Sequence, residues 1–519
     1  MFSQLESVNL LGNLWWLISQ PTTLCTAFAA YIAWEVVYAL YFSPLRNVPG
    51  PLLNRISNLP RLVMMMRGEF TDWVLSSYEK YGNLFFLAHK MVVVCDTNDC
   101  HKILSTHAFS NDMQYAHVDS MEPNMFLTRT PELNKQRWRK VGIAFSIANL
   151  RRMEPTILAA GAQQLLDKWD SAIEQSPRGK VKVCYEKDFL LMTFDIIGSL
   201  GLGKKHRSLT DGNLSVVRWV KQSIALMVMQ MAAGELKWLP LKSLLTKPLR
   251  KDVEEFFAFA NQSIEERKQL LAGGATKPND LLQAYIDTED PGSKIRMTPS
   301  QVTTETINMF LGGTDTSSNT LVLTIHLLML YPQQYRRAAD EVRSNFDKDH
   351  LITFDEAKEK LPYLEACVYE SMRMCPAVSL FPRTVPPGGV TLQGHFIPEG
   401  HTCLLAISAA NMNKGVWDEP RIFNPERFIN NEENKRNVLT FSSGVRICPG
   451  RHLAWVEMLT TLANLLNAYD FALPEDALFM PDNLDKHGQP LAMPRRMVFV
   501  NEPKFPERDC QVVISKRQK

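Results

Sequence analysis

The sequence predicts a mainly α-helical fold with a small β-rich part near the N-terminus. Two long stretches, 131–169 and 299–330, repeat apolar residues at helical spacing and contain few helix breakers. A shorter stretch, 84–95, alternates or clusters apolar residues between Gly82 and Asp96, which is typical of strands. The chain has 519 residues, 45% of them hydrophobic, which is ample for a large core. We therefore expect an α+β architecture dominated by helices.

Charge and cysteine usage exclude two classes of function. The 57 basic and 55 acidic residues give a formal charge of +2, so no excess positive field favours nucleic acid as a partner. The nine cysteines are scattered, without a CxxC pair or the spacing of a structural zinc site. An odd number of cysteines in a chain of this length indicates reduced thiols facing the cytosol, one of which can be a ligand or a nucleophile.

An apolar stretch from Thr22 to Phe42 has the roughly 20 residues that a helix needs to cross a bilayer. Unlike a secretory signal, it has no basic residue before it. We therefore expect residues 1–43 to be an uncleaved single-pass anchor. A buried or monotopic helix is the alternative, because the one charge in the stretch, Glu35, is costly inside a membrane. The positive-inside rule places the rest of the chain in the cytosol, because the basic residues that follow are Arg46, Arg55 and Arg61.

The strongest motif is Phe-Ser-Ser-Gly-Val-Arg-Ile-Cys-Pro-Gly at 441–450. It places the Cys448 thiol directly before an apolar helical run, where backbone amides favour ionised sulfur. Gly444 and Gly450 permit a flat cofactor to approach the backbone closely, and Arg446 can neutralise a cofactor carboxylate. A buried cysteine taken alone is more often a small hydrophobe. Here the spacing indicates a thiolate that binds a metal.

Phe441, Gly444, Arg446, Cys448 and Gly450 fill the FxxGxRxCxG signature without a gap. The chain therefore resembles the cytochrome P-450 family of haem-thiolate monooxygenases, in its membrane-anchored microsomal form. The resemblance implies the cytochrome P-450 fold, with haem b between a long central helix and the cysteine loop. It also implies that Cys448 is the axial ligand to iron, donating electron density that favours O–O bond cleavage.

The resemblance covers the chain from Pro44 to the C-terminus, so it implies one catalytic domain, 44–519, after the anchor of 1–43. The proline-rich run Val48–Pro51 cannot continue a helix and reads as a stiff hinge between the two parts. For the microsomal type the implied location is the endoplasmic reticulum membrane, with the catalytic domain in the cytosol.

The second motif lies in the predicted helix 299–330. Gly312 and Gly313 weaken that helix, and Thr316 is four residues after Gly312, so its hydroxyl can donate to the Gly312 carbonyl and open a groove for dioxygen and water. Asp315 is an ionisable group on a mostly apolar helix, which suggests proton transfer. A simple kink is the alternative. The segment resembles the oxygen-activation stretch of the family, which implies that Asp315 and Thr316 deliver protons beside the haem.

Glu370 and Arg373 are three residues apart and share one face of a helix. Such a pair is common on surfaces, where it contributes about 0.2–1 kcal/mol. However, residues 423–428 resemble the family's meander motif, whose arginine, here Arg427, joins the pair. The resemblance thus implies a buried structural network of Glu370, Arg373 and Arg427 behind the haem.

The family also holds the haem carboxylates with basic residues, and the resemblance assigns Arg383 and Arg446 to two of these contacts. For a third, the family commonly has an arginine four residues after a tryptophan in an early helix, but Gly142 follows Trp138 at that spacing. We expect Arg139 to take this place. The alternatives are Arg137 and Lys140. A solvated face, or a site that attracts an acidic electron donor, is another interpretation of the basic run Lys135, Arg137, Arg139 and Lys140.

The resemblance implies a monooxygenase that inserts one atom of O₂ into a lipophilic small molecule of the steroid, terpenoid or fatty acyl type. Electrons would come from NADPH through NADPH-cytochrome P-450 reductase, with cytochrome b5 as an additional donor. Two alternatives stay open: a haem-thiolate catalyst that consumes or rearranges a peroxide, and a non-catalytic haem sensor. The candidate pocket walls are 109–126, the methionine-rich 223–245 and 378–381.

Overall fold

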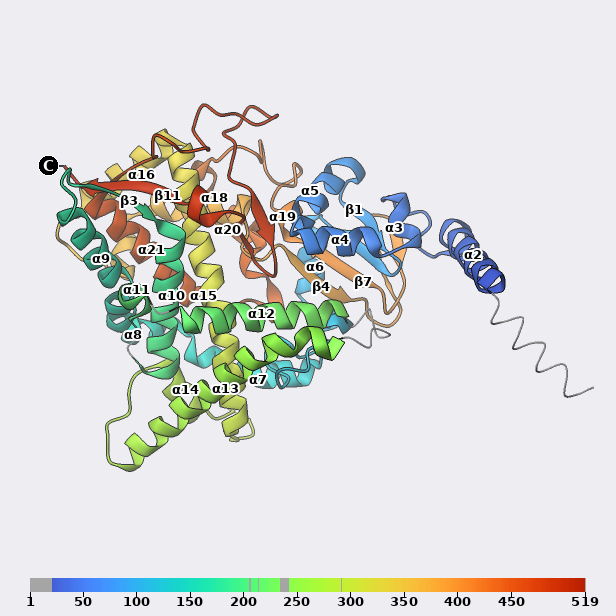
Figure 1. Ribbon diagram of the computed structural model, residues 1–519, viewed down its shortest axis with the longest axis horizontal. Coiled ribbons are helices and arrows are strands. Elements are labelled where there is room, and N and C mark those ends of the chain that lie inside the picture. The colour runs from blue at the N-terminus through green and yellow to red at the C-terminus, as the bar shows by residue number, and fades with distance from the viewer. Residues whose placement is uncertain (1–20, 205–206, 213, 234–241, 291, 519) are drawn as a thin grey trace, which may run out of the picture.

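The structure is a computed structural model that describes residues 21–518 apart from 205–206, 213, 234–241 and 291. Helices make up most of the described chain and small sheets accompany them, as the sequence predicts. Figure 1 shows the helical part on one side and the largest sheet between it and the N-terminal helix.

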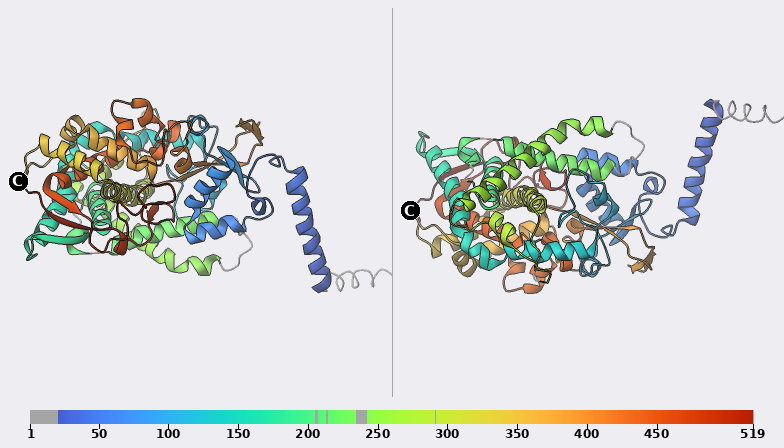
Figure 2. Two further views of the ribbon diagram at one scale, coloured as in Figure 1. Left: turned by 90° about the horizontal axis from the view of Figure 1, so that it is seen from above. Right: turned by 90° about the horizontal axis from the view of Figure 1, so that it is seen from below.

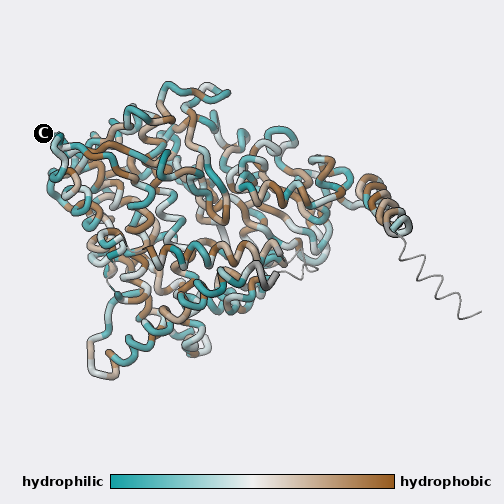
Figure 3. Tube along the Cα trace, in the orientation of Figure 1, coloured by the Kyte–Doolittle hydropathy of each residue, from teal (hydrophilic) through white to brown (hydrophobic). Residues whose placement is uncertain are grey.

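The N-terminal helix α2 (Pro21–Val37) continues through a π-helical turn (Tyr38–Phe42). Figures 1 and 2 show it standing away from the rest of the chain, and Figure 3 shows that many of its residues are hydrophobic. Within the described residues, Pro21–Phe42 is the one helix long and apolar enough to cross a membrane. Such a segment is compatible with the anchor expected from the sequence.

The largest sheet has the strand order β1-β2-β7-β4. Strands β1 (Leu84–Ala88) and β2 (Met91–Val94) lie in the stretch 84–95, which the sequence predicts to be strand, and they pair as an antiparallel hairpin. Strand β2 pairs in parallel with β7 (Thr402–Ala406), which pairs antiparallel with β4 (Leu380–Thr384). Apolar side chains cover both faces, so the sheet is buried and fixes β4 beside the centre of the molecule. The smaller sheets consist of β3 (Lys180–Cys184), β11 (Gln511–Lys516) and β8 (Tyr469–Ala472); β5 (Val390–Leu392) and β6 (His395–Ile397); and β9 (Arg495–Met497) and β10 (Asn501–Pro503).

The predicted helix 299–330 is confirmed as α15 (Pro299–Leu330). Thr298 and Gln301 form a capping box and Pro299 occupies the first turn, so the start of the helix is specified locally. The predicted stretch 131–169 is instead three helices: α7 (Pro131–Ala144), α8 (Ile147–Ala160) and α9 (Ala162–Glu174). The breaks follow from Ser146, extended before α8, and Gly161, which lies outside helical geometry between α8 and α9.

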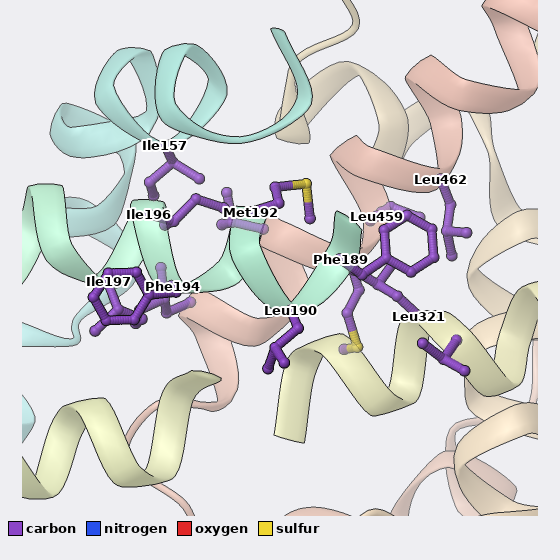
Figure 4. Close-up of a cluster of buried hydrophobic side chains, with 14 of the residues drawn as sticks. Ile157, Phe189, Leu190, Met192, Phe194, Ile196, Ile197, Leu321, Leu459 and Leu462 are labelled. Carbon is purple, nitrogen blue, oxygen red and sulfur yellow. The ribbon is translucent and has the colours of Figure 1, made fainter. Parts of the chain in front are cut away.

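The core is centred on α10 (Tyr185–Leu202), whose side chains are almost all buried. Figure 4 shows Phe189 and Met192 of α10 with Leu321 of α15 and with Leu459 and Leu462 of α21 (Arg451–Ala468). This packing holds α15 and the helix that follows Cys448 in fixed relation. The interior is close-packed, so the space left between these elements has a defined shape.

The remaining described helices surround this core and the sheet. Their bounds are α3 (Leu52–Ile56), α4 (Leu59–Arg67), α5 (Phe70–Tyr81), α6 (Thr97–Leu104), α11 (Ser208–Asp211), α12 (Ser215–Ala233), α13 (Lys242–Ala272), α14 (Leu281–Asp287), α16 (Pro332–Asn345), α17 (Phe354–Lys360), α18 (Pro362–Met374), α19 (Ile407–Ala410), α20 (Glu432–Asn437) and α22 (Pro506–Asp509).

Candidate functional site

Cys448 lies in a loop that leads directly into α21, as the sequence predicts. Its backbone N–H donates to the carbonyl of Phe441 at 2.8 Å, which ties the two ends of the motif together. Burial raises the pKa of the Cys448 thiol to about 11, although the backbone N–H groups of Gly450 and Arg451 act in the opposite direction. These amides help an anionic sulfur, but they need a cation such as a metal ion to complete the ionisation.

Glycine serves a different purpose at each of the two positions in the loop. Gly444 has a φ of +63°, and a Cβ there would lie 2.4 Å from the carbonyl oxygen of Leu104 at the end of α6. Gly444 is therefore required by the backbone angle and by packing on α6, and not by a cofactor as we expected. A Cβ on Gly450 would meet only the Cys448 sulfur, at 3.9 Å, so Gly450 leaves open space beside the thiol.

A cavity of about 270 Å³ lies between α15 and the cysteine loop. Phe441, Arg446 and Cys448 line one side, and Gly312 and Thr316 of α15 line the other. The three stretches expected as pocket walls all contribute side chains, although residues 234–241 of the second stretch lie outside the described residues. The first stretch contributes the polar Asn111 and Asn124. The other contributors are Tyr115, Met121, Met125, Phe126, Ile224, Met227, Val378, Leu380 and Phe381.

The helix α15 presents Gly312 and Thr316 to the cavity as predicted. The Thr316 hydroxyl donates to the Gly312 carbonyl at 2.6 Å, and a Cβ on Gly312 would meet nothing within 4 Å. Gly313 also lies on the wall, but a Cβ there would be 2.7 Å from Ile197 of α10, so its small size serves helix packing. Gly312 is thus the open position and Thr316 is the hydroxyl beside it.

Asp315 is buried on α15 but does not line the cavity. Burial raises its pKa to about 6, the charge of Lys221 lowers it, and that of Glu502 raises it. Lys221 and Arg496 pair with Glu502 and are partly exposed, so this charged cluster reaches solvent. Asp315 therefore lies on the cavity helix and faces a charged cluster that is in contact with water. This arrangement can move protons.

We expect Asp315→Asn to stabilise the protein near neutral pH. The folded pKa is above the ordinary 3.8, so the folded state keeps a proton that the unfolded chain loses, and stability falls as the pH rises from about 4 to about 6. Removing the titration should raise the free energy of unfolding by up to about 3 kcal/mol at about pH 8, and by little at about pH 4. Urea unfolding across this range tests it. Equal pH slopes for the two proteins would refute the buried-acid assignment.

Arg383 and Arg446 are the best indication of what the cavity holds. Both line it, and among the described residues neither forms an ion pair with a carboxylate. Arg383 donates to the carbonyl of Pro382 and also hydrogen-bonds the Tyr115 side chain, and Arg446 donates to the carbonyl of Thr128. Burial and the charge of Arg383 lower the pKa of Arg446 to about 10. Two neighbouring cations, Arg383 buried and Arg446 half-buried, are costly when no acid pairs with them. The residues present therefore fit a cofactor that brings its own carboxylates.

The expectation for Arg139 is wrong. Its guanidinium lies outside the cavity, half exposed, and pairs with Asp290 at 2.9 Å. The basic alternatives do not line the cavity either: Arg137 lies 3.8 Å from Glu305, and Lys140 is buried. Helix α7 instead brings uncharged side chains, among them Asn134 and Trp138, to the cavity wall. The Trp138 ring rests on Gly142, where a Cβ would lie 2.3 Å from the ring.

The structure brings Glu370, Arg373 and Arg427 together. The Arg373 Nε and Glu370 Oε2 atoms are 2.6 Å apart, and Arg427 Nε is 3.1 Å from Glu370 Oε1. The backbone N–H of Asn424 also donates to Glu370, and Arg373 donates to the carbonyl of Asn411. Glu370 and Arg373 are completely buried. The network ties α18 to the segment that precedes the cysteine loop.

Two carboxyl groups on the cavity wall were missed by the sequence reasoning. Glu305 of α15 and Glu457 of α21 are both buried, and burial raises their pKa values to about 7 and about 8. Glu305 is seven residues before Gly312, the spacing of two helical turns, so its place on the same face as Gly312 could have been predicted. Glu457 follows Cys448 by nine residues on an apolar helix and offers the weaker signal of a charge among apolar neighbours.

Comparisons with known proteins agree with this fold and cavity. The cytochrome P-450 family model matches residues 48–496. Two Aspergillus fumigatus proteins, named cytochrome P-450 monooxygenase helB1 and helB2, are 39% and 38% identical over 503 residues, which is 96% of this chain and 87% and 99% of theirs. A solved cytochrome P-450 haem domain matches 91% of this chain and 98% of its own length, with a TM-score of 0.74 at 19% identity.

The chain therefore belongs to the cytochrome P-450 family. It is a monooxygenase, and its family and fold imply a haem-thiolate iron cofactor.

Proposed function

We propose that Cys448 is the axial ligand of haem b and that the protein inserts one atom of O₂ into a C–H bond or double bond of a lipophilic molecule. The observation that carries this proposal is the cavity itself. It joins the Cys448 thiol to the open Gly312 position and has two uncompensated arginines, Arg383 and Arg446, on its wall.

When bound, the haem-thiolate iron supplies the chemistry of reductive dioxygen activation. The protein's own groups bind, orient and move protons. Cys448 would hold the iron, and Arg383 and Arg446 would donate to the cofactor carboxylates. Thr316 holds its hydroxyl at the Gly312 carbonyl, facing the cavity, and Asp315 exchanges protons with the charged cluster behind α15.

The electrons would come from NADPH through NADPH-cytochrome P-450 reductase, with cytochrome b5 as an additional donor. We propose that residues 1–43 anchor the protein in the endoplasmic reticulum membrane and that 44–519 form one cytosolic catalytic domain. The exposed apolar helix of Pro21–Phe42 supports the anchor, because most of its apolar side chains, among them Phe28, Tyr31 and Trp34, are exposed. A membrane location would also suit an apolar substrate.

The substrate would be of steroid, terpenoid or fatty acyl type. The support is the cavity wall, which is formed largely by methionine, phenylalanine and aliphatic side chains. Such a wall binds apolar surface and supplies few groups that fix orientation. The methionines, among them Met121, Met125 and Met227, can adapt to an irregular shape.

Isotopically labelled dioxygen tests the proposal. The purified haem-loaded protein is incubated with NADPH, the reductase and a panel of one steroid, one terpene and one fatty acid. One labelled oxygen atom in a product, dependent on NADPH and on reductase, is the expected result. Product formed from peroxide alone would favour the reductase-independent alternative. Haem-loaded protein that forms no product and consumes no oxygen would favour the sensor.

We expect Thr316→Ala to uncouple oxygen consumption from product formation, since the hydroxyl beside Gly312 would be lost while the fold remains. The measured quantity is the ratio of product to NADPH consumed, with peroxide determined in parallel, and it should fall by about tenfold or more. The matched control is Thr324→Ala. The Thr324 hydroxyl makes the same bond, to the Thr320 carbonyl at 2.8 Å, but does not line the cavity. Equal coupling in the two variants would refute the role of Thr316.

A further inference from the structure

One corner of the cavity is polar, and its central group is Glu305. The side chain is 1% exposed and lies on the cavity wall. Its Oε1 atom accepts a hydrogen bond from the backbone N–H of Met125 at 3.0 Å. The Asn308 side chain is near enough to lower the pKa of Glu305, but Oε2 still has no hydrogen-bond partner of good geometry among the described residues. A buried carboxylate oxygen without a partner is costly, and native structures seldom leave one without a reason. The position of Glu305 on the wall of the cavity indicates that a bound molecule supplies the missing donor.

The neighbours of Glu305 define what kind of donor fits. Arg137 Nε lies 3.8 Å from Glu305 Oε1, is itself buried, and is not part of the cavity wall. Its positive charge therefore stands behind the carboxylate and already compensates it. A second cation in the cavity would be repelled by Arg137, whereas a neutral hydroxyl would not be. Uncharged polar side chains, Asn124, Asn134 and Asn308, complete this corner of the wall.

The helix fixes how far this corner is from the site of oxygen chemistry. Glu305 and Gly312 are seven residues apart on α15, so they lie on one face and are separated by about 10 Å along the helix axis. Met309 lies between them on the helix and also lines the cavity, as do other apolar groups such as Phe126 and Ile224. A ligand that reaches both ends must therefore be apolar over most of its length.

We propose that Glu305 accepts a hydrogen bond from a neutral hydroxyl group of the substrate. The substrate would then be an elongated apolar molecule with a hydroxyl about 10 Å from the carbon that faces Gly312. This inference rests on the proposed function, because it assigns a substrate class to the same cavity. Glu305 would set the orientation of the substrate and hence the position that is oxidised.

Ligand binding to the ferric haem-loaded protein tests this assignment. The probes are androstanol, its methyl ether and the corresponding androstanyl amine, which share one rigid apolar scaffold. Titrations followed by the absorbance change of the haem, well above pH 7 so that Glu305 is ionised, give the three dissociation constants. Androstanol should bind about tenfold or more tightly than the ether, which cannot donate, because a hydrogen bond to a charged group is involved. It should also bind more tightly than the amine.

The variant Glu305→Gln separates recognition from folding. An amide can accept from Met125 and donate to either oxygen, so the preference for alcohol over ether should fall to within about threefold. The matched control, Met309→Leu, changes the wall one turn away and should alter both constants by the same factor. An unchanged preference in Glu305→Gln, equal or absent binding of alcohol and ether by the wild type, or tightest binding of the amine would overturn the proposal. Because no electrons or oxygen are used, failure here is distinct from failure of turnover.

Discussion

Replacing Glu370 with alanine is expected to lower the free energy of unfolding by about 3–5 kcal/mol, the usual cost of stranding one partner of a buried ion pair. Arg373 is completely buried and would lose both of its hydrogen bonds to the carboxylate, and Arg427 would lose its contact with Oε1. This is a large share of the stability of a typical domain. Urea or thermal unfolding of the haem-loaded protein measures the loss.

Two further variants make this result interpretable. Glu370→Gln keeps an acceptor for Arg373 and should fall between the wild type and Glu370→Ala, so it remains measurable if the alanine variant does not fold. Asp355→Ala breaks an exposed ion pair with Arg151 and should cost no more than about 1 kcal/mol. A loss at Glu370 no greater than that at Asp355 would contradict a structural role for the buried network.

Replacing Cys448 with alanine is expected to abolish NADPH-dependent monooxygenation while the fold persists. The loop is held by backbone contacts such as Cys448 N–H to Phe441, which alanine retains, so the variant removes the proposed iron ligand and keeps the loop. Without a thiolate the iron would lose the electron donation that favours O–O cleavage. Product formation per haem measures the loss of activity, and circular dichroism shows whether the fold persists.

The control for this variant is another cysteine. Cys184 is half buried at the end of β3 and does not line the cavity, so Cys184→Ala should retain turnover. Equal activity of Cys448→Ala and Cys184→Ala would show that the thiol of Cys448 is not the ligand.

Much of the site could be predicted because its signals are local. Helix α15 has its capping box, its proline and its threonine-to-glycine spacing within one segment, so both its bounds and the Thr316 contact followed from the sequence. The cysteine loop is likewise a single run that leads into α21. Its chemistry depends on neighbours in sequence, and these are visible without coordinates.

The parts that could not be predicted depend on distant partners. The side chain of Arg139 points toward Asp290, which is far along the chain. The spacing of charges on α7 does not reveal which basic side chain points toward the cavity. The pairing of β2 with β7 joins strands about three hundred residues apart, for which local pattern gives no register. The sequence could have placed Glu305 on the same helix face as Gly312. Only the structure shows that its Oε2 atom has no hydrogen-bond partner among the described residues and that Arg137 lies beside it.

The most direct test of the central claim is the absorption spectrum of the reduced protein with carbon monoxide, compared between the wild type and Cys448→Ala. We predict a strongly red-shifted Soret band in the wild type and its absence in the variant, because only an axial thiolate produces that shift. A folded, haem-loaded wild-type protein without this band would contradict the assignment of Cys448 as the ligand to iron.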